Sequence, residues 1–396
     1  MMESNGSAAE ALQRLERAYR GEERPDVLWK QNGGVVVGWW GEDVPEELLV
    51  AAGCLPVRIR GMRDSGGSGF PMADKYLERG FDVLVRARFE RLAGGECANL
   101  DRVVLSNSSD AIVRVFYYLR AIRTMEPDVR VPEPYFYDFM HSRSRMAALY
   151  NRERLRELKR AVESWTGRGV TFDDLSRAVA VCNENRRLLK KLAEWRTADP
   201  PRIGGATALC VIGAAAAMPK EEHSRLLRVV LEEAPSFPPL SGVRVFVTGS
   251  AHDDPDVYEL IESCGAVVVG EDHETGNRYF GGLVAEDADP VDAIVDRYHL
   301  RSPESARATV SERVAALAGQ VRRCRAQAVI AYIHAADDAP SWDAPEQAKA
   351  LASAGVPMLV LDRRPSGLPD KDELRGRIAE FLGSVRKRAE NGGDRR

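Results

Sequence analysis

Short apolar runs alternate with amphipathic segments in the first part of the chain. The runs predict strands separated by helices, in the order strand 33–40, helix 43–53, strand 54–60, strand 101–106, helix 111–123 and strand 128–136. The last of these segments contains two prolines, which we expect to end the strand. The short connections between strands and helices favour a parallel sheet.

The middle of the chain has a different pattern. Charged segments with a helical period occupy most of residues 149–231. Thr171 and Asp174 have the spacing of a capping box, which predicts the start of a helix at this point. We therefore interpret this region as a helical connector.

The alternation of strands and helices then returns. It predicts strand 243–250, helix 255–265, strand 266–272, strand 326–334, helix 345–355 and strand 356–362. The sequence thus predicts an α/β fold in which two Rossmann/flavodoxin-like parallel-sheet domains are joined by a helical connector. The expected boundaries are an N-terminal helix at 1–30, a first domain at 31–148, the connector at 149–235 and a second domain at 236–396. A cleft between two such domains is the natural place for a ligand.

A glycine- and serine-rich loop at residues 61–71 lies between the predicted strands of the first domain. It precedes residues 72–94, whose pattern predicts one helix. A loop of this composition, next to the predicted cleft, is a candidate cover for a site.

Charge and hydropathy narrow the class of protein. The 56 basic and 60 acidic residues give a net charge of -4, so electrostatics give no reason to expect nucleic acid or a membrane as a partner. The N-terminus lacks the features of a signal peptide, and the most apolar segment, residues 208–218, is too short to span a bilayer. We therefore expect a cytoplasmic protein.

Linear cofactor motifs are missing from the sequence. The six cysteines include no C-x-x-C pair, which speaks against a zinc knuckle or a linear ferredoxin motif. Neither a P-loop nor a G-x-G-x-x-G motif follows a strand, so we expect neither an intrinsic ATPase nor a nicotinamide enzyme.

The stretch VVLSNSSD at residues 103–110 joins a predicted strand to a predicted helix. In an open α/β sheet such a corner is where ligands bind. Ser109 is therefore placed either to contact a ligand or to cap the helix.

Several segments, spread in order over nearly the whole chain, carry a family resemblance. Among them are VPEELLVAAGCLPVRIRG, ADKYL, NSSD, NENRRLL, VFVTGS and GAVVVGEDHETGNRYFGG. Together they resemble the 2-hydroxyacyl-CoA dehydratase and benzoyl-CoA reductase family, the D-component of systems such as 2-hydroxyglutaryl-CoA dehydratase. The resemblance implies a heterodimer of related subunits, each holding an iron-sulfur cluster through three cysteines. It also implies an ATP-hydrolysing activator that supplies one electron for removing a hydroxyl group from an acyl-CoA.

The three cysteine positions of the family carry other residues in this sequence. Either Phe81 or Asp82 stands at the first position, Ser109 at the second (NSSD) and Ala336 at the third (HAADD). An alanine cannot bind iron, and a serine hydroxyl is a poor replacement for a thiolate. We therefore expect no [4Fe-4S] cluster, no other metal and no intrinsic cofactor, with acyl-CoA as the candidate ligand.

Two hypotheses about function follow. In the first, the protein is a subunit without its own cluster that binds or shapes an acyl-CoA site beside a cysteine-bearing paralogous subunit, with an ATP-dependent activator as a further partner. In the second, it is a repurposed stand-alone enzyme that dehydrates an acyl-CoA or carboxylate substrate by acid-base chemistry. We favour the subunit hypothesis, because no replacement catalytic set is evident in the sequence.

The candidate site residues come from the predicted strand ends and their loops. Those with a candidate catalytic role are Glu46, Glu47 and His334. Those with a candidate substrate-binding role are Trp39, Ser109, Gly249, Ser250 and Arg278. Each has a structural alternative, since the two glutamates also suit the first turn of a helix.

Overall fold

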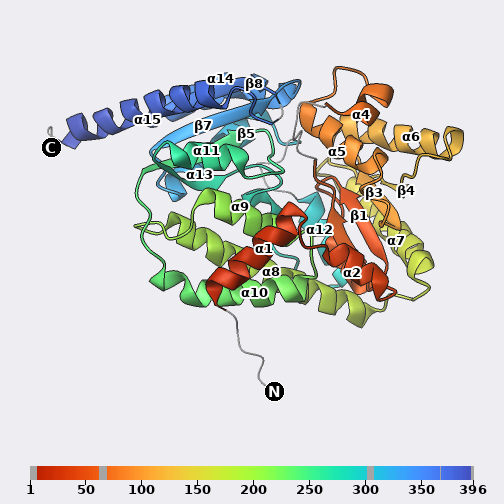
Figure 1. The fold of residues 1–396 in the computed structure, drawn as a ribbon. Coiled ribbons are helices and arrows are strands. Elements are labelled where there is room, and N and C mark those ends of the chain that lie inside the picture. Colours follow the sequence, from red (N-terminus) through yellow and green to blue (C-terminus); the bar gives the residue numbers. More distant parts are fainter. Residues whose placement is uncertain (1–6, 62–68, 301–306, 366, 394–396) are drawn as a thin grey trace.

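The computed structural model describes residues 7–61, 69–300, 307–365 and 367–393. Within them the chain forms two four-stranded sheets, and every strand pair in both sheets is parallel. In Figure 1 the first sheet lies at the right and the second at the upper left, above a row of helices. The predicted α/β fold with two parallel-sheet domains is confirmed. Most of the glycine-rich loop at 61–71 lies outside the described residues.

The first sheet has the strand order β2-β1-β3-β4. Its strands are β1 (Val36–Trp40), β2 (Leu55–Arg58), β3 (Arg102–Ser106) and β4 (Glu133–Tyr137). The helices that alternate with them are α2 (Pro25–Gln31), α3 (Glu46–Ala51), α4 (Pro71–Tyr76), α5 (Val83–Ala93) and α6 (Asp110–Met125). β1 is buried along its whole length, as expected for a central parallel strand covered on both faces.

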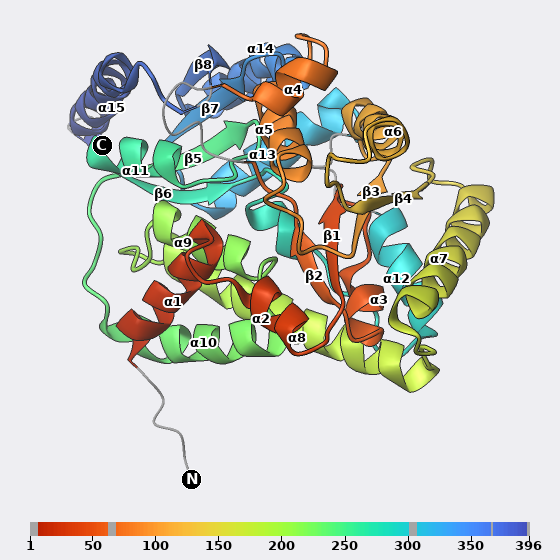
Figure 2. The same ribbon diagram turned by 45° about the vertical axis from the view of Figure 1, so that its right-hand side comes forward.

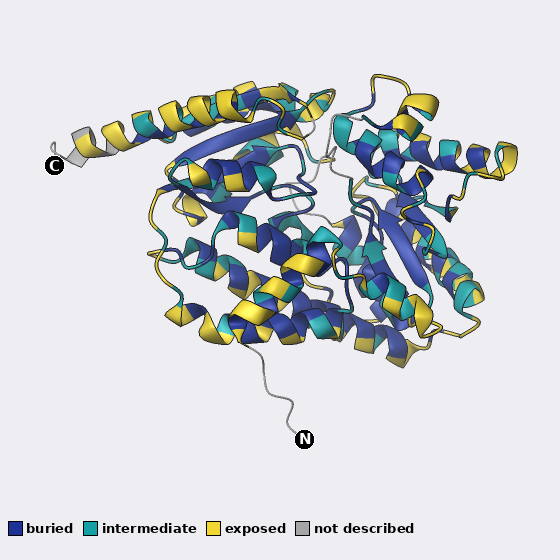
Figure 3. Ribbon diagram, viewed as in Figure 1, coloured by how far each residue is buried: buried dark blue, intermediate teal, exposed yellow. Residues whose placement is uncertain are grey.

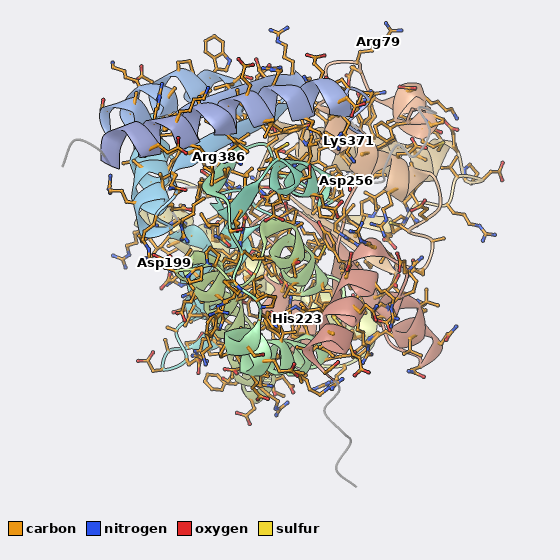
Figure 4. All side chains as sticks on the ribbon, turned by 60° about the vertical axis from the view of Figure 1, so that its left-hand side comes forward. Arg79, Asp199, His223, Asp256, Lys371 and Arg386 are labelled. Carbon is orange, nitrogen blue, oxygen red and sulfur yellow. The ribbon has the colours of Figure 1, made fainter. Side chains whose placement is uncertain are left out.

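The second sheet has the strand order β6-β5-β7-β8. Its strands are β5 (Val243–Gly249), β6 (Ala266–Glu271), β7 (Ala328–His334) and β8 (Met358–Arg364). Its helices are α11 (Asp256–Ser263), α13 (Val310–Arg323), α14 (Asp338–Ser353) and α15 (Lys371–Gly393). Arg386, labelled on α15 in Figure 4, donates to the carbonyl oxygens of Cys264 and Gly265 at 3.2 and 2.9 Å. These bonds hold α15 against the start of β6.

A helical layer joins the two sheets. It consists of α1 (Ala8–Arg20), α7 (Arg145–Thr166), α8 (Phe172–Thr197), α9 (Gly205–Ala214) and α10 (Lys220–Glu233), with short 3-10 turns η1 (Ala234–Ser236) and η2 (Asn277–Phe280). The capping box predicted at Thr171 and Asp174 is confirmed at the start of α8. α1 packs across α9 and α10 (Figure 2), and α8 contacts both α3 and β6. Through α8 the two units share one helical support.

The segment after β6 returns to the first unit. Helix α12 (Pro290–His299), which the sequence pattern did not predict, packs on α7 and α8. Its Ile294 and Val295 belong to the same apolar core as Val37 of β1 and Val104 of β3. Residues that follow the second sheet's β6 in sequence therefore complete the core beside the first sheet.

Two predictions about local structure are wrong. Residues 72–94 form two helices, because the side chain of Asp82 accepts hydrogen bonds from the N–H groups of Leu84 and Val85 and starts α5 anew. The two prolines of 128–136 do not end a strand, since Pro132 precedes β4 and Pro134 lies within it. β4 is an edge strand that pairs only with β3, so a missing backbone N–H is tolerated there.

Burial follows the layers. The central strands β1, β3, β5 and β7 are mostly buried, whereas the edge strands β4 and β8 are partly exposed. Figure 3 shows this buried centre and the exposed outer turns of α15. In the described part of the chain, no helix is both long and apolar enough to cross a bilayer.

The return of the chain toward α12 depends on a buried asparagine. Asn183 of α8 donates from Nδ2 to the carbonyl oxygen of Val284 at 2.8 Å and accepts from the Val284 N–H at 3.0 Å. We expect Asn183→Ala to destabilise the protein by about 2 kcal/mol, because it leaves both backbone groups of Val284 without a partner. Urea denaturation followed by circular dichroism measures the change.

The matched control is Glu184→Ala, one residue further along α8. Glu184 is partly exposed and pairs with Arg228 at 2.9 Å, an interaction worth less than about 1 kcal/mol at a protein surface. Equal destabilisation by the two substitutions would contradict the role assigned to Asn183.

Candidate active site

A cavity of about 230 Å³ lies between the two units, where strands of both sheets end. Residues from the first unit and from the second line it, among them Trp40, Asp82, Ser109, Gly249, Asp272 and Asp337. The carboxyl ends of parallel strands are where α/β proteins bind their ligands. We refer to this space as the strand-end cavity.

The positions at which the resemblance implies cysteines lie at or near this cavity. Of the two alternatives for the first position, Asp82 lines the cavity and Phe81 does not. Ser109 lines it, and Ala336 lies just before Asp337, which also lines it. The N–H of Val83 donates to the carbonyl oxygen of Ala335 at 3.4 Å, so the first and third positions adjoin across the boundary between the units. The fold therefore brings together three positions spread over more than 200 residues of sequence.

The side chains at these positions have structural roles. Ser109 accepts from the N–H of Ile112 at 3.3 Å, which confirms that it caps α6. Asp82 caps α5, Phe81 is buried in the core beside it, and Ala336 adopts a left-handed backbone conformation with φ of 65°. No thiol is present at any of the three.

The cysteines of the chain lie elsewhere. Cys54, Cys97, Cys210 and Cys324 belong to four different apolar cores. Burial raises the pKa of the Cys54, Cys182 and Cys210 thiols to about 12, so each is held as the neutral thiol. Among the described residues, no group of three histidine, cysteine or acidic side chains is arranged to hold a metal ion. The residues present do not fit a thiolate-bound cluster at the strand-end cavity.

Buried ion pairs form the wall of the cavity. Arg88 of α5 donates to Asp253 at 2.8 and 2.9 Å and to Glu274 at 3.0 Å, and Arg58 contacts Glu274 at 2.9 Å. Burial alone would raise the pKa of Glu274, but Arg58 and Arg88 lower it to about 2. Arg278 pairs with Glu42 at 2.6 Å, and both side chains line the cavity.

A cluster of histidines and tyrosines adjoins this wall, and one of them, His273, also lines the cavity. His252 lies between His273 and His334, with ring centroids 5.3 and 5.6 Å away. The Tyr258 hydroxyl is 2.7 Å from Nε2 of His273, and burial lowers the pKa of His273 and of His334 to about 4. These imidazoles are therefore neutral near pH 7.

The candidate catalytic residues occupy different surroundings. Glu46 pairs with Lys220 and accepts from the Tyr279 hydroxyl at 3.0 Å. Glu47 pairs with Arg186 at 2.5 Å and accepts from the Tyr298 hydroxyl at 3.0 Å.

Neither glutamate lines the strand-end cavity. Glu46 borders a neighbouring space of about 20 Å³, together with Trp39. His334 does not line the strand-end cavity either, and its Nε2 lies 3.2 Å from the carbonyl oxygen of Ala251.

The candidate substrate-binding residues fall mostly around the cavity. Ser109, Gly249, Ser250 and Arg278 all line it. The tryptophan that lines it is Trp40, whereas Trp39 points to the smaller space, because neighbouring residues of β1 face opposite sides of the sheet.

Two carboxyl groups outside the candidate catalytic set of Glu46, Glu47 and His334 face the cavity. Asp337 accepts from the Ser250 hydroxyl at 2.6 Å, and Asp82 uses one oxygen to cap α5. Burial raises the pKa of both, that of Asp82 to about 6, although the two helical N–H groups that Asp82 caps work against the rise. The sequence could have pointed to Asp82 and Asp337, because they lie at or beside the positions where the resemblance implies cysteines.

Comparison with known proteins decides the family. Residues 43–385 match the family described as 2-hydroxyglutaryl-CoA dehydratase, D-component. The chain belongs to this family. It is 22% identical to the (R)-phenyllactyl-CoA dehydratase beta subunit of Clostridium sporogenes, over 84% of this chain and 87% of the relative.

Other members of the dehydratase family show the same level of similarity. The chain is 22% identical to the beta subunit of (R)-2-hydroxyglutaryl-CoA dehydratase of Acidaminococcus fermentans, over 83% of this chain and 87% of that protein. It is 25% identical to one of the subunits of benzoyl-CoA reductase of Thauera aromatica, over 65% of this chain and 66% of that protein. The resemblance stated from the sequence is confirmed.

The raised pKa of Asp82 gives a pH-dependent prediction. Because its pKa is above that of an unfolded chain, about 3.9, the native state loses stability as pH rises toward 6 and then levels off. Asp82→Asn keeps the helix cap and removes the charge. We expect its stability relative to wild type to increase by about 1 kcal/mol from pH 5 to pH 8, measured by urea denaturation.

The control for this measurement is Asp173→Asn. Asp173 also lies in the first turn of a helix, but its side chain is exposed. Its substitution should have the same effect at both pH values. A pH-independent effect of Asp82→Asn would show that Asp82 is as well solvated as Asp173.

Proposed function

We propose that this protein is a dehydratase-family subunit without its own iron-sulfur cluster, which shapes an acyl-CoA site beside a cluster-bearing partner. The partner would be a cysteine-bearing paralogous subunit in the cytoplasm, supplied with electrons by an ATP-dependent activator. One observation carries the proposal: at the positions where the resemblance implies cysteines, Asp82 and Ser109 line an open cavity and cap helices there, Phe81 is buried in the core, and Ala336 offers no donor atom.

The names of the relatives support a paired role. The Clostridium sporogenes and Acidaminococcus fermentans proteins are beta subunits, and the Thauera aromatica protein is one subunit of a reductase. In the proposed role the partner carries the redox chemistry, and this chain contributes binding groups.

The cavity has groups suited to a thioester or carboxylate. Ser250 and the backbone at Gly249 lie at the end of β5, and Arg278 adds a guanidinium to the lining. Hydrogen-bond donors of this kind orient a carbonyl oxygen. The volume of about 230 Å³ suits the acyl end of a ligand rather than a whole coenzyme A.

A second function is favoured by the two carboxyl groups in the cavity. A stand-alone dehydratase needs one group that protonates the leaving hydroxyl and another that accepts a proton. Asp82 and Asp337 line the same space, and burial raises the pKa of each. In this alternative Asp82 and Asp337 would have the catalytic roles that the sequence suggested for Glu46, Glu47 and His334. Those three residues do not line the cavity.

Iron analysis tests the subunit proposal. We expect the protein, purified without oxygen, to contain no stoichiometric iron or acid-labile sulfide and to lack a cluster absorption band. Ser109→Cys should behave in the same way, because Asp82 and Ala336 still provide no thiolate.

A cysteine-bearing family member purified in parallel serves as the positive control. About one cluster per chain in the wild-type protein would contradict the proposal. If the isolated chain dehydrates a 2-hydroxyacyl-CoA without partner or activator, and Asp82→Asn abolishes the reaction, the stand-alone alternative holds instead.

A further inference from the structure

A second cavity, of about 410 Å³, lies where the N-terminal helix meets both units. It is lined by Tyr19 and Arg20 at the end of α1, by Arg60 and Gly61 after β2, by Arg91 of α5 and by Asp253. We call it the N-terminal cavity. It is separated from the strand-end cavity by the ion pair of Arg88 with Asp253, since Arg88 lines one space and Asp253 the other.

Arg60 differs from the other inward-facing arginines. Arg58, Arg88 and Arg186 each pair with a carboxylate within 3.0 Å. Across the described ranges, no ion pair joins Arg60 to a carboxylate, and its guanidinium carbon instead lies 4.3 Å from the centroid of the Tyr19 ring. A guanidinium in such a recess, stacked on an aromatic ring, keeps its N–H donors available to a ligand.

The nearest acid cannot serve Arg60. Both oxygens of Asp253 are used by Arg88, and Oδ2 also accepts from the N–H of Gly61 at 2.6 Å. Burial lowers the pKa of Arg60, and the neighbouring Arg91 adds to this effect. An anion bound in the cavity would offset both the burial of the Arg60 charge and its repulsion by Arg91.

Arg91 supplies a second unsatisfied donor. Its Nε is buried and has no hydrogen-bond acceptor in the part of the chain that the structure describes. The closest carboxylate oxygen, from the exposed Glu96, is 3.7 Å away, beyond hydrogen-bonding distance. The guanidinium groups of Arg60 and Arg91 thus border the same cavity, and each has N–H donors available to a ligand.

From this arrangement we propose that the N-terminal cavity binds a phosphate group through Arg60 and Arg91. Guanidinium groups offer paired N–H donors that match the oxygens of a phosphate. The exposed Glu22 and Glu96 and the half-buried Asp254 also border the cavity and would repel an extended polyanion, so a compact phosphate fits and a nucleic acid does not. The site goes beyond the proposed function, because it is separate from the strand-end cavity.

Two sources could provide this group. One is free inorganic phosphate, and the other is the phosphorylated nucleotide end of a molecule such as coenzyme A. The volume of about 410 Å³ is within the range of pockets that hold small molecules, so either is accommodated.

Isothermal titration calorimetry of the full chain with inorganic phosphate, ADP and coenzyme A, each up to millimolar concentration, tests the proposal. We expect at least one of the three to bind wild type, and Arg60→Gln and Arg91→Gln each to weaken that binding about tenfold or more. Binding of phosphate alone would identify a free oxyanion as the ligand. Tighter binding of ADP or coenzyme A would identify a nucleotide.

The matched control is Arg120→Gln. Arg120 also stacks on aromatic rings, at 5.8 Å from Phe116 and 5.6 Å from Tyr117, but on an exposed face of α6. This variant should bind as wild type does. Circular dichroism verifies the fold of each variant, and if Arg60→Gln does not fold, Arg91→Gln decides the test.

Two results would overturn the proposal. One is the absence of binding heat for all three compounds. The other is that folded Arg60→Gln or Arg91→Gln binds these compounds as tightly as Arg120→Gln does. Neither result bears on iron content or dehydration, so the proposed function is judged separately.

Discussion

The buried guanidinium of Arg88 is the contact on which the geometry between the two units depends. It extends from α5 of the first unit to Asp253 and Glu274, which follow strands of the second. Removing a guanidinium from water costs several kcal/mol, and only well-placed carboxylates offset that cost. Burial alone would lower the pKa of Arg88, yet its two partners raise it. The loops after β5 and β6 are therefore held at fixed positions relative to α5. These positions in turn determine the shape of the strand-end cavity and of the N-terminal cavity, which lie on either side of the ion pair.

The approach of Asp82, Ser109 and Ala336 to one another follows from the same constraint. Once α5 is fixed against the second unit, its cap Asp82 must lie next to the end of β7, where the Val83 N–H reaches the carbonyl oxygen of Ala335. Ser109 follows β3, whose carboxyl end faces the strand-end cavity. The scaffold thus gathers these positions through helix caps and buried ion pairs, none of which requires iron.

The sequence predicted those parts of the structure that depend on local chemistry. Periodic apolar runs indicated the strands of both sheets, and the spacing of Thr171 and Asp174 indicated the start of α8. Contacts between distant segments were beyond its reach. Glu46 and Glu47 were candidates both for the cleft and for the first turn of a helix, and they lie in the first turn of α3. The sequence could not show that Lys220 and Arg186, far along the chain, hold them in buried pairs. α12 was missed although its local pattern contains a start signal, with Asp289 as cap and Pro290 in the first turn; what the sequence could not show is that its apolar face packs on the first unit.

The lining of the strand-end cavity includes charged and polar side chains from both units. Apolar side chains that filled this space would add stability. Here Asp82 and Asp337 border it instead, in surroundings that disfavour their charged forms. Such unfavourable burial of carboxyl groups in an open cleft is characteristic of functional sites. The strand-end cavity therefore brings hydroxyl and carboxyl groups of both units into one space, where they can donate and accept hydrogen bonds from two sides.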